Sequence, residues 1–355
     1  MIPSLRIAQI VPPIERVPPE SYGGTERVVF ELVTELVRRG HDVTTFASGD
    51  SAVPGTLVPT EPRALRPAGH GGDISGFLIS TTLQAIARQA EFDILHSHLE
   101  WYSLVLRRAV TRPFVATFHG RLDVPWSRTA LADSPDGLVA ISESQASDHP
   151  TVPWTIVHNG LTLDAAPFER RRSDDLVFVG RVTPEKGIIA AIEIALASGR
   201  HLKIAAKVGP TPPEQDYYRE VFEPALKRAG ASVEFVGELS GDDRDALMAR
   251  AHAVLMPGSW PEPFGLVAIE ALACGAPVLA RRVGGLGEII REGIDGFFGD
   301  DVTQPAFLVD RIDELDRGAI RASVIDRFSA SRMADGYEAL YRRMVDGAAV
   351  DSAVA

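Results

Sequence analysis

The stretch Pro-Glu-Pro-Phe-Gly-Leu-Val-Ala-Ile-Glu at residues 261–270 decides how this 355-residue chain is interpreted. Between Gly265 and Arg281, every residue except Glu270 is apolar, glycine or proline. This pattern predicts a buried helix followed by a buried strand, with one carboxylate embedded in it. A buried carboxylate needs a partner. We therefore expect Glu270 to meet either a ligand or a buried arginine.

The start of the predicted helix has the properties of an anion site. Pro263 disfavours helical angles at Glu262, which leaves that carboxylate on an extended arm just outside the helix. The free amides of about residues 264–267 and the positive end of the helix dipole converge there. The eight steps from Glu262 to Glu270 span at least about 12 Å, roughly the separation of a sugar from a ribose across a diphosphate.

The rest of the chain carries two βαβ patterns, which predict two parallel α/β domains. The first joins a strand at residues 5–11 to a strand at 42–46 through an amphipathic helix. The second begins with a strand at 176–179 and continues with a helix at 188–197. Residues 51–75 show no period and are expected to form a surface excursion, and the charged residues 169–175 are expected to form a linker.

Two loops at strand ends carry features that suit a phosphate. Arg181 and Lys186 follow the strand at 176–179, where an arginine fork and a lysine point charge could meet a diphosphate. A solvated charged loop is the alternative. The pair Gly23-Gly24 opens the first helix and would let a phosphate approach the backbone, although a plain turn explains it equally well in isolation.

The spacing of Glu262 and Glu270, with Pro-Phe-Gly between them, resembles the signature of retaining GT-B glycosyltransferases, most closely glycosyltransferase family 4. In that family the first glutamate contacts hydroxyls of the donor sugar, and the backbone after it contacts the diphosphate. The second glutamate binds the ribose. The alternative is that Glu262 is a loop carboxylate and Glu270 pairs with a buried arginine.

The resemblance extends to other loops. It implies that Arg181 and Lys186 bind the diphosphate, that His119 lies near the donor sugar, and that the loop from Val236 to Leu239 borders the nucleobase. The implied catalytic residues are Glu262, His119, Arg181 and Lys186. The implied donor-binding residues are Gly23, Gly24, Arg181, Lys186, Val236, Leu239, Glu262, Phe264, Gly265, Leu266, Val267 and Glu270.

The implied fold is α/β of the GT-B type, with two Rossmann-like domains facing across a cleft. We expect an acceptor domain at residues 1–165 and a nucleotide-sugar donor domain at 166–325. A C-terminal helix at 326–346 is expected to cross back onto the first domain, and the residues after Asp346 are expected to fray.

Composition narrows the choice of partners and cofactors. A net charge of −12 argues against nucleic acid. A single cysteine, Cys274, excludes an intramolecular disulfide. His96 and His98 have no third ligand in the pattern, and Asp243-Arg244-Asp245 is better explained as a helix start than as a metal site. With no signal peptide or membrane-length apolar run, we expect a cytoplasmic protein. The resemblance to GT-B enzymes implies that it needs neither a metal ion nor a cofactor.

The function implied by the resemblance is transfer of a hexose from a nucleotide-diphosphate sugar to a hydroxyl acceptor, with retention at the anomeric carbon. UDP-glucose is the first choice of donor and GDP-mannose the second; the sequence does not identify the acceptor. A GT-B sugar-nucleotide epimerase and a non-catalytic nucleotide-sugar binding protein are the alternatives. A pyridoxal phosphate-dependent phosphorylase would need a Schiff-base lysine, and the chain has only four lysines.

Overall fold

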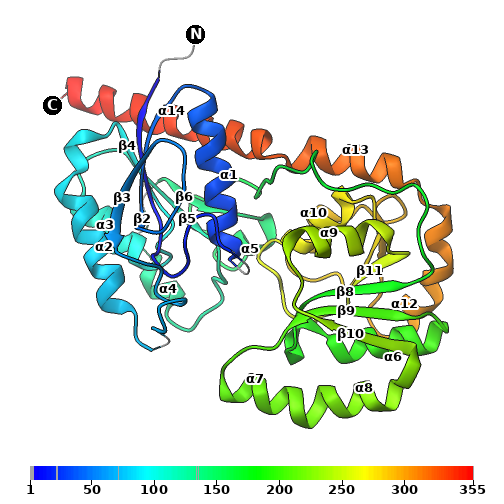
Figure 1. Cartoon of the computed structure of the whole chain (residues 1–355). Helices are drawn as coiled ribbons and strands as arrows, with labels where there is room; N and C mark the ends of the chain where they lie inside the picture. Colours follow the sequence, from blue (N-terminus) through cyan, green and yellow to red (C-terminus); the bar gives the residue numbers. More distant parts are fainter. Residues whose placement is uncertain (1–3, 21–22, 71, 133, 135, 355) are drawn as a thin grey trace. The chain divides into compact units, whose positions relative to one another are not determined.

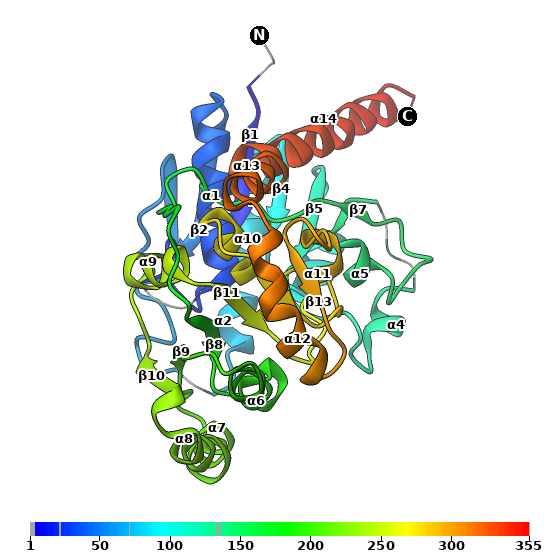
Figure 2. The ribbon, with the colours of Figure 1, turned by 90° about the vertical axis from the view of Figure 1, so that its right-hand side faces the viewer.

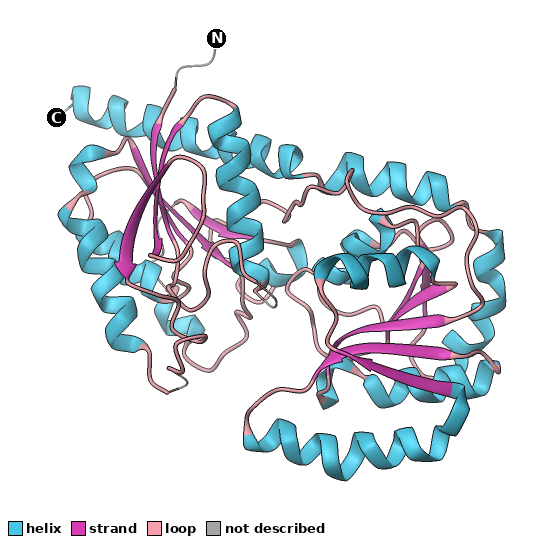
Figure 3. Ribbon diagram, in the orientation of Figure 1, coloured by secondary structure: helices cyan, strands magenta, loops and turns pink. Residues whose placement is uncertain are grey.

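The computed structural model describes residues 4–20, 23–70, 72–132, 134 and 136–354. Internal contacts divide the chain into two units. The N-terminal unit comprises Met1–Leu161 and Phe328–Ala355, and the C-terminal unit comprises Thr162–Arg327. Each unit has its own sheet with helices on both faces (Figures 1 and 3).

The described part of the N-terminal unit is built on a seven-stranded parallel sheet in the order β3-β2-β1-β4-β5-β6-β7. The strands are β1 (Arg6–Ile10), β2 (Asp42–Ser48), β3 (Thr56–Glu61), β4 (Ile94–Ser97), β5 (Phe114–Phe118), β6 (Leu138–Ala140) and β7 (Thr155–Ile156). The helices are α1 (Gly24–Arg38), α2 (Ser75–Ala87), η1 (Gln89–Glu91), α3 (Tyr102–Ala109), α4 (Ser127–Ala130), α5 (Glu143–Ala146) and α14 (Ala330–Val354).

The C-terminal unit has a six-stranded parallel sheet in the order β10-β9-β8-β11-β12-β13. The strands are β8 (Leu176–Arg181), β9 (Leu202–Lys207), β10 (Val233–Gly237), β11 (Ala253–Met256), β12 (Val278–Ala280) and β13 (Gly296–Phe298). The helical segments are η2 (Pro184–Lys186), α6 (Ile188–Ser198), α7 (Pro212–Tyr217), η3 (Tyr218–Phe222), α8 (Glu223–Ala229), η4 (Gly230–Ser232), α9 (Gly241–Arg250), α10 (Leu266–Ala273), α11 (Leu286–Ile289), α12 (Thr303–Leu308), η5 (Val309–Glu314) and α13 (Arg317–Phe328).

Helices cover the second sheet on both faces. On one face α6 and α8 lie side by side, and α7 and α8 form one continuous rod (Figures 1 and 2). On the other face α9 packs against α10. The order of strands reverses between β8 and β11, and the crevice at such a switch point is where ligands bind in open α/β sheets.

The C-terminal helix α14 packs on α1 and β4 of the N-terminal unit, as predicted (Figure 1). Tyr337 and Tyr341 are buried in that unit. Arg39 at the end of α1 binds Glu338 at 2.9 Å and Asp335 at 2.8 Å. The helix runs to Val354, so the expected fraying after Asp346 is not seen; alanines in this segment favour the helical state.

Two other expectations about loops are wrong. The excursion at residues 51–75 contains β3, an edge strand whose half-exposed side chains and Pro59 hide its period. The expected linker at 169–175 belongs to the C-terminal unit. There, the Ser173 N–H donates to the Arg250 carbonyl at 2.7 Å, and Glu169 forms an exposed ion pair with Arg250.

Arg317 joins the ends of two helices in the C-terminal unit. Its buried guanidinium donates to the carbonyls of Ala251 at 2.8 Å, Ala249 at 2.5 Å and Cys274 at 3.4 Å, which end α9 and α10. Burial lowers the pKa of Arg317 to about 10. The side chain therefore satisfies backbone acceptors that the two helices cannot satisfy themselves.

We expect Arg317→Met to lower the free energy of unfolding by about 2–4 kcal/mol, because it leaves buried carbonyls without a donor. Arg219→Met is the matched control: Arg219 is exposed and pairs with Asp216, so its loss should change stability by less than about 0.5 kcal/mol. Urea denaturation of both variants measures the difference. Equal effects would contradict a capping role for Arg317.

Candidate active site

Three loops of the C-terminal unit meet at the carboxyl ends of β8, β11 and β12. They comprise residues 182–187, 257–265 and 281–285. Because β8 and β11 flank the switch point, their loops leave the sheet side by side. Lys186 lies on the first loop and Glu262 on the second, and the strand order brings them together from positions 76 residues apart.

The first two loops touch backbone to backbone. A Cβ atom on Gly187 would lie 2.7 Å from the Gly258 nitrogen, and one on Gly258 would lie 2.6 Å from the Glu185 carbonyl oxygen. Gly187 also has a φ of +73°, which favours glycine. The Trp260 N–H donates to the Glu185 carbonyl at 3.4 Å. Glycine at both positions is what allows the loops to approach this closely.

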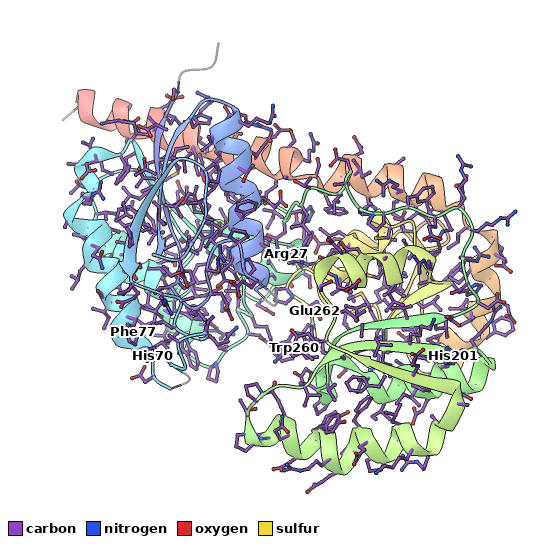
Figure 4. The ribbon with its side chains drawn as sticks, in the orientation of Figure 1. Arg27, His70, Phe77, His201, Trp260 and Glu262 are labelled. Atoms are coloured by element: carbon purple, nitrogen blue, oxygen red, sulfur yellow. The ribbon has the colours of Figure 1, made fainter. Side chains whose placement is uncertain are left out.

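This approach places the Lys186 ammonium in direct contact with the Glu262 carboxylate. Both side chains are mostly buried, with exposed fractions of 24% and 19%. Glu262 and Trp260 occupy the same loop in Figure 4. The site therefore presents a cation and an anion side by side, so that each can meet a different part of one ligand.

The third loop holds the backbone of Glu262. The Gly285 N–H donates to the Glu262 carbonyl at 2.8 Å. A Cβ on Gly284, whose φ is +58°, would lie 2.2 Å from that carbonyl oxygen. Glu262 is thus fixed by contacts on both sides, and its carboxylate is aimed by backbone packing.

Helix α10 begins at Leu266, with Gly265 as its N-cap at a φ of +119°. The sequence predicted free amides from about residue 264 onward. The helix starts two residues later, because Pro263 and the left-handed backbone of Gly265 delay its first turn. Phe264 is buried beneath the helix start. Leu266 and Val267 therefore supply free amides at the positive end of the dipole.

Arg181 lies at the end of β8 between two carboxylates. Its guanidinium is 3.4 Å from Glu214 and 3.6 Å from Glu185. Its Nε atom is buried and meets no acceptor among the described residues. The Thr211 hydroxyl lowers the pKa of Glu214, which keeps that carboxylate ionised.

Glu270 is 5% exposed and lies in the middle of α10. Its Oε1 accepts from Arg244 Nη2 at 2.9 Å, and the same Arg244 nitrogen binds Asp245 at 2.7 Å. The structure thus brings Glu270 to an arginine, one of the two expected kinds of partner, although Arg244 is partly exposed. Its binding of a ribose stays a prediction.

A cavity of about 340 Å³ separates α9 from the sheet. Val236 and Leu239 line it, as does Asp243 at the helix start. The Ser240 hydroxyl oxygen accepts from the backbone N–H of Asp243 at 3.2 Å, which is the predicted N-cap arrangement. Asp243 and Asp245 have different partners, and the described residues contain no group of three metal-ligating side chains.

In the N-terminal unit, Gly23 and Gly24 begin α1 as predicted. A Cβ on Gly23 would lie 2.8 Å from Pro19 and 3.0 Å from the Glu26 carboxylate. Burial is the main cause that raises the pKa of Glu26 to about 7, with nearby Glu15 adding to it. Close packing explains the glycine at position 23, and phosphate binding there stays a prediction.

His119 lies just beyond the carboxyl end of β5 and is half-buried. Glu100 accepts from the backbone N–H groups of His119 and Gly120 at 3.0 and 3.1 Å. Glu100 has a φ of +50°, a strained conformation for this residue type. Burial raises the pKa of its carboxyl to about 7. The loop that carries His119 is therefore held by a strained, buried acid.

Sequence reasoning missed Arg244, Glu214 and Glu100 as parts of these sites. Arg244 falls in the triplet that was weighed as a metal site, and its contact with Glu270 depends on the packing of α9 against α10. Glu100 lies just after His96-Ser97-His98, at the carboxyl end of a strand. That position could have identified it from the sequence, because ligands bind at such strand ends.

The described chain has no helix long and apolar enough to cross a membrane. Two parallel-sheet units, with paired charges beside a helix start in the second, define a GT-B glycosyltransferase fold. The AviGT4 glycosyltransferase of avilamycin A biosynthesis matches with a TM-score of 0.72 and 24% identity, covering 97% of this chain and 98% of that one. Anabaena HepE in complex with UDP-glucose matches with a TM-score of 0.71 and 18% identity, covering 95% and 99%.

The chain belongs to the glycosyltransferases of family 4: residues 22–165 match Glycosyltransferase Family 4, and residues 163–324 match Glycosyl transferases group 1. A glycogen synthase of Mycobacterium tuberculosis is 28% identical over 79% of this chain and 79% of its own length. A D-inositol 3-phosphate glycosyltransferase of Mycobacterium bovis is 29% identical over 91% of this chain and 79% of its own. The predicted family and fold class are confirmed.

We expect Gly187→Ala to lower the free energy of unfolding by more than about 2 kcal/mol, because it adds a clash with Gly258 to the strain of a positive φ. Gly199→Ala is the control: its φ is +66° and nothing lies near its Cβ, so it should cost only about 1 kcal/mol. Urea denaturation of both variants compares them. A smaller loss in Gly187→Ala would contradict the backbone contact between the two loops.

We expect Glu100→Gln to change how stability depends on pH. With a folded pKa of about 7 against an ordinary 4.5, the folded state holds the proton longer, so the stability that Glu100 contributes falls as pH rises through this window. The wild type should therefore lose about 3 kcal/mol relative to Glu100→Gln between pH 4.5 and pH 8. A difference in unfolding free energy that does not change with pH would refute this.

Proposed function

We propose that this glycosyltransferase moves a hexose from a nucleotide-diphosphate sugar to an acceptor hydroxyl, with retention at the anomeric carbon and without a metal ion. The observation that carries the proposal is the Lys186–Glu262 pair beside the start of α10. A cation and free helix amides suit a diphosphate, and an adjacent carboxylate suits sugar hydroxyls.

The proposed donor site lies in the C-terminal unit. Lys186, Arg181 and the amides of Leu266 and Val267 bind the diphosphate, and the buried Nε of Arg181 is a donor that such an anion would satisfy. Glu262 binds hydroxyls of the sugar. Glu270 binds the ribose, with Arg244 orienting its carboxylate. Val236 and Leu239 border the base.

In the proposed reaction, the bond from the anomeric carbon to the phosphate oxygen breaks as the acceptor oxygen bonds to the same face of that carbon. The acceptor proton passes to the leaving phosphate oxygen, so no protein nucleophile is needed. Arg181, Lys186 and the helix amides stabilise the charge that grows on the diphosphate. The two side-chain cations and the helix dipole do here what a metal ion does in other transferases.

We propose UDP-glucose as the first donor and GDP-mannose as the second. HepE has been crystallised with UDP-glucose, and starch synthase IV of Arabidopsis thaliana with ADP. Because the base is bordered by Val236 and Leu239 and by backbone, these residues alone do not select it. A thermal-shift panel of UDP, GDP, ADP and their glucose and mannose conjugates identifies the donor. A ligand at about 100 times its dissociation constant adds about 2.7 kcal/mol of stability.

We expect Lys186→Ala to lower kcat by roughly 10² to 10³ with the donor so identified, because it removes a cation from the leaving diphosphate. Lys227→Ala is the control: Lys227 is exposed on α8, pairs with Glu223 and should affect kcat less than about threefold. Initial rates of both variants at saturating donor provide the measurement. Near-normal turnover in Lys186→Ala would overturn the assignment.

A further inference from the structure

Helix α2 of the N-terminal unit exposes large apolar side chains and buries two threonines. Ile79 is 51% exposed, and Leu83, one turn further along the helix, is 60% exposed. Thr81 and Thr82 lie on the side that faces the core, and both are buried. A surface helix normally shows the opposite arrangement, with polar residues outside. The packing of this unit therefore does not explain Ile79 and Leu83.

Helix α3 lies beside α2 and extends its apolar outer side (Figure 1). Val105 on α3 is 65% exposed. The ends of the two helices are tied together, because the Thr111 N–H donates to Gln89 Oε1 at 2.8 Å and Arg112 donates to the Ala90 carbonyl at 3.2 Å. The two outer sides thus form one continuous surface.

This surface becomes cationic toward the end of α3. Arg108 follows Val105 by three residues, so it projects from the same side of the helix, and it is exposed. Arg107 lies next to it, with a buried Nε that has no acceptor among the described residues. Neither guanidinium forms an ion pair within the described part of the chain. We define the α2–α3 face as Ile79, Leu83, Val105, Arg107 and Arg108.

The charge of this face is opposite to that of the whole chain. Residues 74–90 and 101–112 contain four arginines and no aspartate or glutamate, whereas the chain has a net charge of −12. On α2 and its end, Arg88 is paired with Glu91. The positive charge that remains lies at the end of α3, next to the apolar side chains.

Three kinds of partner could cover the α2–α3 face: a second copy of this chain, an acidic protein or an anionic lipid surface. In a two-fold dimer each copy presents the same patch, which brings Arg107 and Arg108 toward their own counterparts. A protein partner forms hydrogen bonds across its interface, and the outer side of α2 offers few polar groups for them. Both of these partners fit only half of the face.

An anionic bilayer fits both halves. Exposed apolar side chains enter the boundary between headgroups and acyl chains, and arginines bind the phosphates of the headgroups. Trp126, which is also exposed, lies against Trp101 at the start of α3, with ring centroids 6.4 Å apart. Tryptophan favours the interface between membrane and water.

We propose that the α2–α3 face docks the protein on the surface of an anionic phospholipid bilayer. Ile79, Leu83 and Val105 enter the interface, and Arg107 and Arg108 bind lipid phosphates. Docking is separate from sugar transfer, because none of these side chains belongs to the proposed donor site. Vesicle binding can therefore be measured on the full chain without any substrate.

Flotation with vesicles tests the charge requirement. One set of vesicles is phosphatidylcholine alone, and the other contains about 30 mol% phosphatidylglycerol. We expect the wild type to bind the anionic vesicles at least about tenfold more tightly, and added salt to weaken that binding. Equal affinity for both sets would overturn the proposal. Binding to neither set would also overturn it and would favour an acidic protein as the partner.

Substitutions test whether the α2–α3 face is the surface that binds. The double variant Ile79→Ser/Leu83→Ser should bind anionic vesicles roughly tenfold more weakly or worse, because it removes most of the apolar surface that enters the interface. Leu196→Ser is the control: Leu196 is similarly exposed on α6 of the C-terminal unit, and its loss should change nothing. These side chains are exposed, so the variants should unfold as the wild type does. An equal loss in the control would refute the assignment to this face.

Arg108→Gln should weaken binding to anionic vesicles about fivefold, whereas Arg219→Gln on the distant η3 should leave it unchanged. Equal binding by both variants would overturn the role of Arg108.

Sedimentation of the wild type without lipid tests the competing occupant. We expect a monomer, with the same result for Ile79→Ser/Leu83→Ser. A dimer that the double variant dissociates would assign the face to a second copy and overturn lipid docking. Absence of transferase activity would overturn the proposed function and leave lipid docking standing, because flotation measures docking alone.

Discussion

The backbone contact between Gly187 and Gly258 is the constraint on which the C-terminal site depends. The reversal of strand order between β8 and β11 sends two loops out of the sheet side by side, but it does not fix how closely they approach. That distance is set by the absence of side chains at both glycines. Lys186 and Glu262 sit one and four residues from these contacts, so their pairing follows from the packing of the main chain. The close contact between the two loop backbones can thus hold the flexible Lys186 side chain near the Glu262 carboxylate.

The charges of this unit are paired before any ligand arrives. Lys186 lies against Glu262, Arg181 between Glu214 and Glu185, and Arg244 between Glu270 and Asp245. Such pairs limit the cost of burying each charge. Donor binding must then exchange protein partners for phosphate and hydroxyl groups, so its net free energy is a difference between similar interactions. Pairing of this kind favours a ligand that supplies both an anion and hydroxyls at the right spacing. It does not favour anions in general.

The sequence predicts the fold better than it predicts the partners of each site residue. The apolar periodicity of α1 and the βαβ patterns predict two parallel sheets, because a buried helix face shows in the sequence as regularly spaced apolar residues. The edge strand β3 shows no such spacing, since its side chains are half-exposed and Pro59 interrupts it. In the 261–270 stretch, Glu262 lies on the loop before α10 and Glu270 in the middle of that helix, as the pattern of Pro263 and the apolar residues predicts. Arg244 and Glu100 could not be assigned, because their contacts depend on how α9 meets α10 and on a strained turn, neither of which has a local pattern.

A chain of hydrogen bonds in the core of the N-terminal unit, from His119 through His98 and Gln9 to Tyr341, raises the question of why a core should hold hydrogen bonds where apolar side chains would pack. Polar groups in a core add little net stability, but they accept few arrangements, because each unmet donor or acceptor is costly. Gln9 links two parts of this chain, since its amide nitrogen donates to the Tyr341 hydroxyl and its amide oxygen lies 2.8 Å from His98 Nε2. The same reasoning explains the placement of α14. Its charged pairs with Arg39 and its buried tyrosines attach it to the unit, and the Tyr341 hydroxyl accepts from the Gln9 amide at 3.0 Å. The C-terminal helix is therefore connected chemically, as well as sterically, to the loop that carries His119.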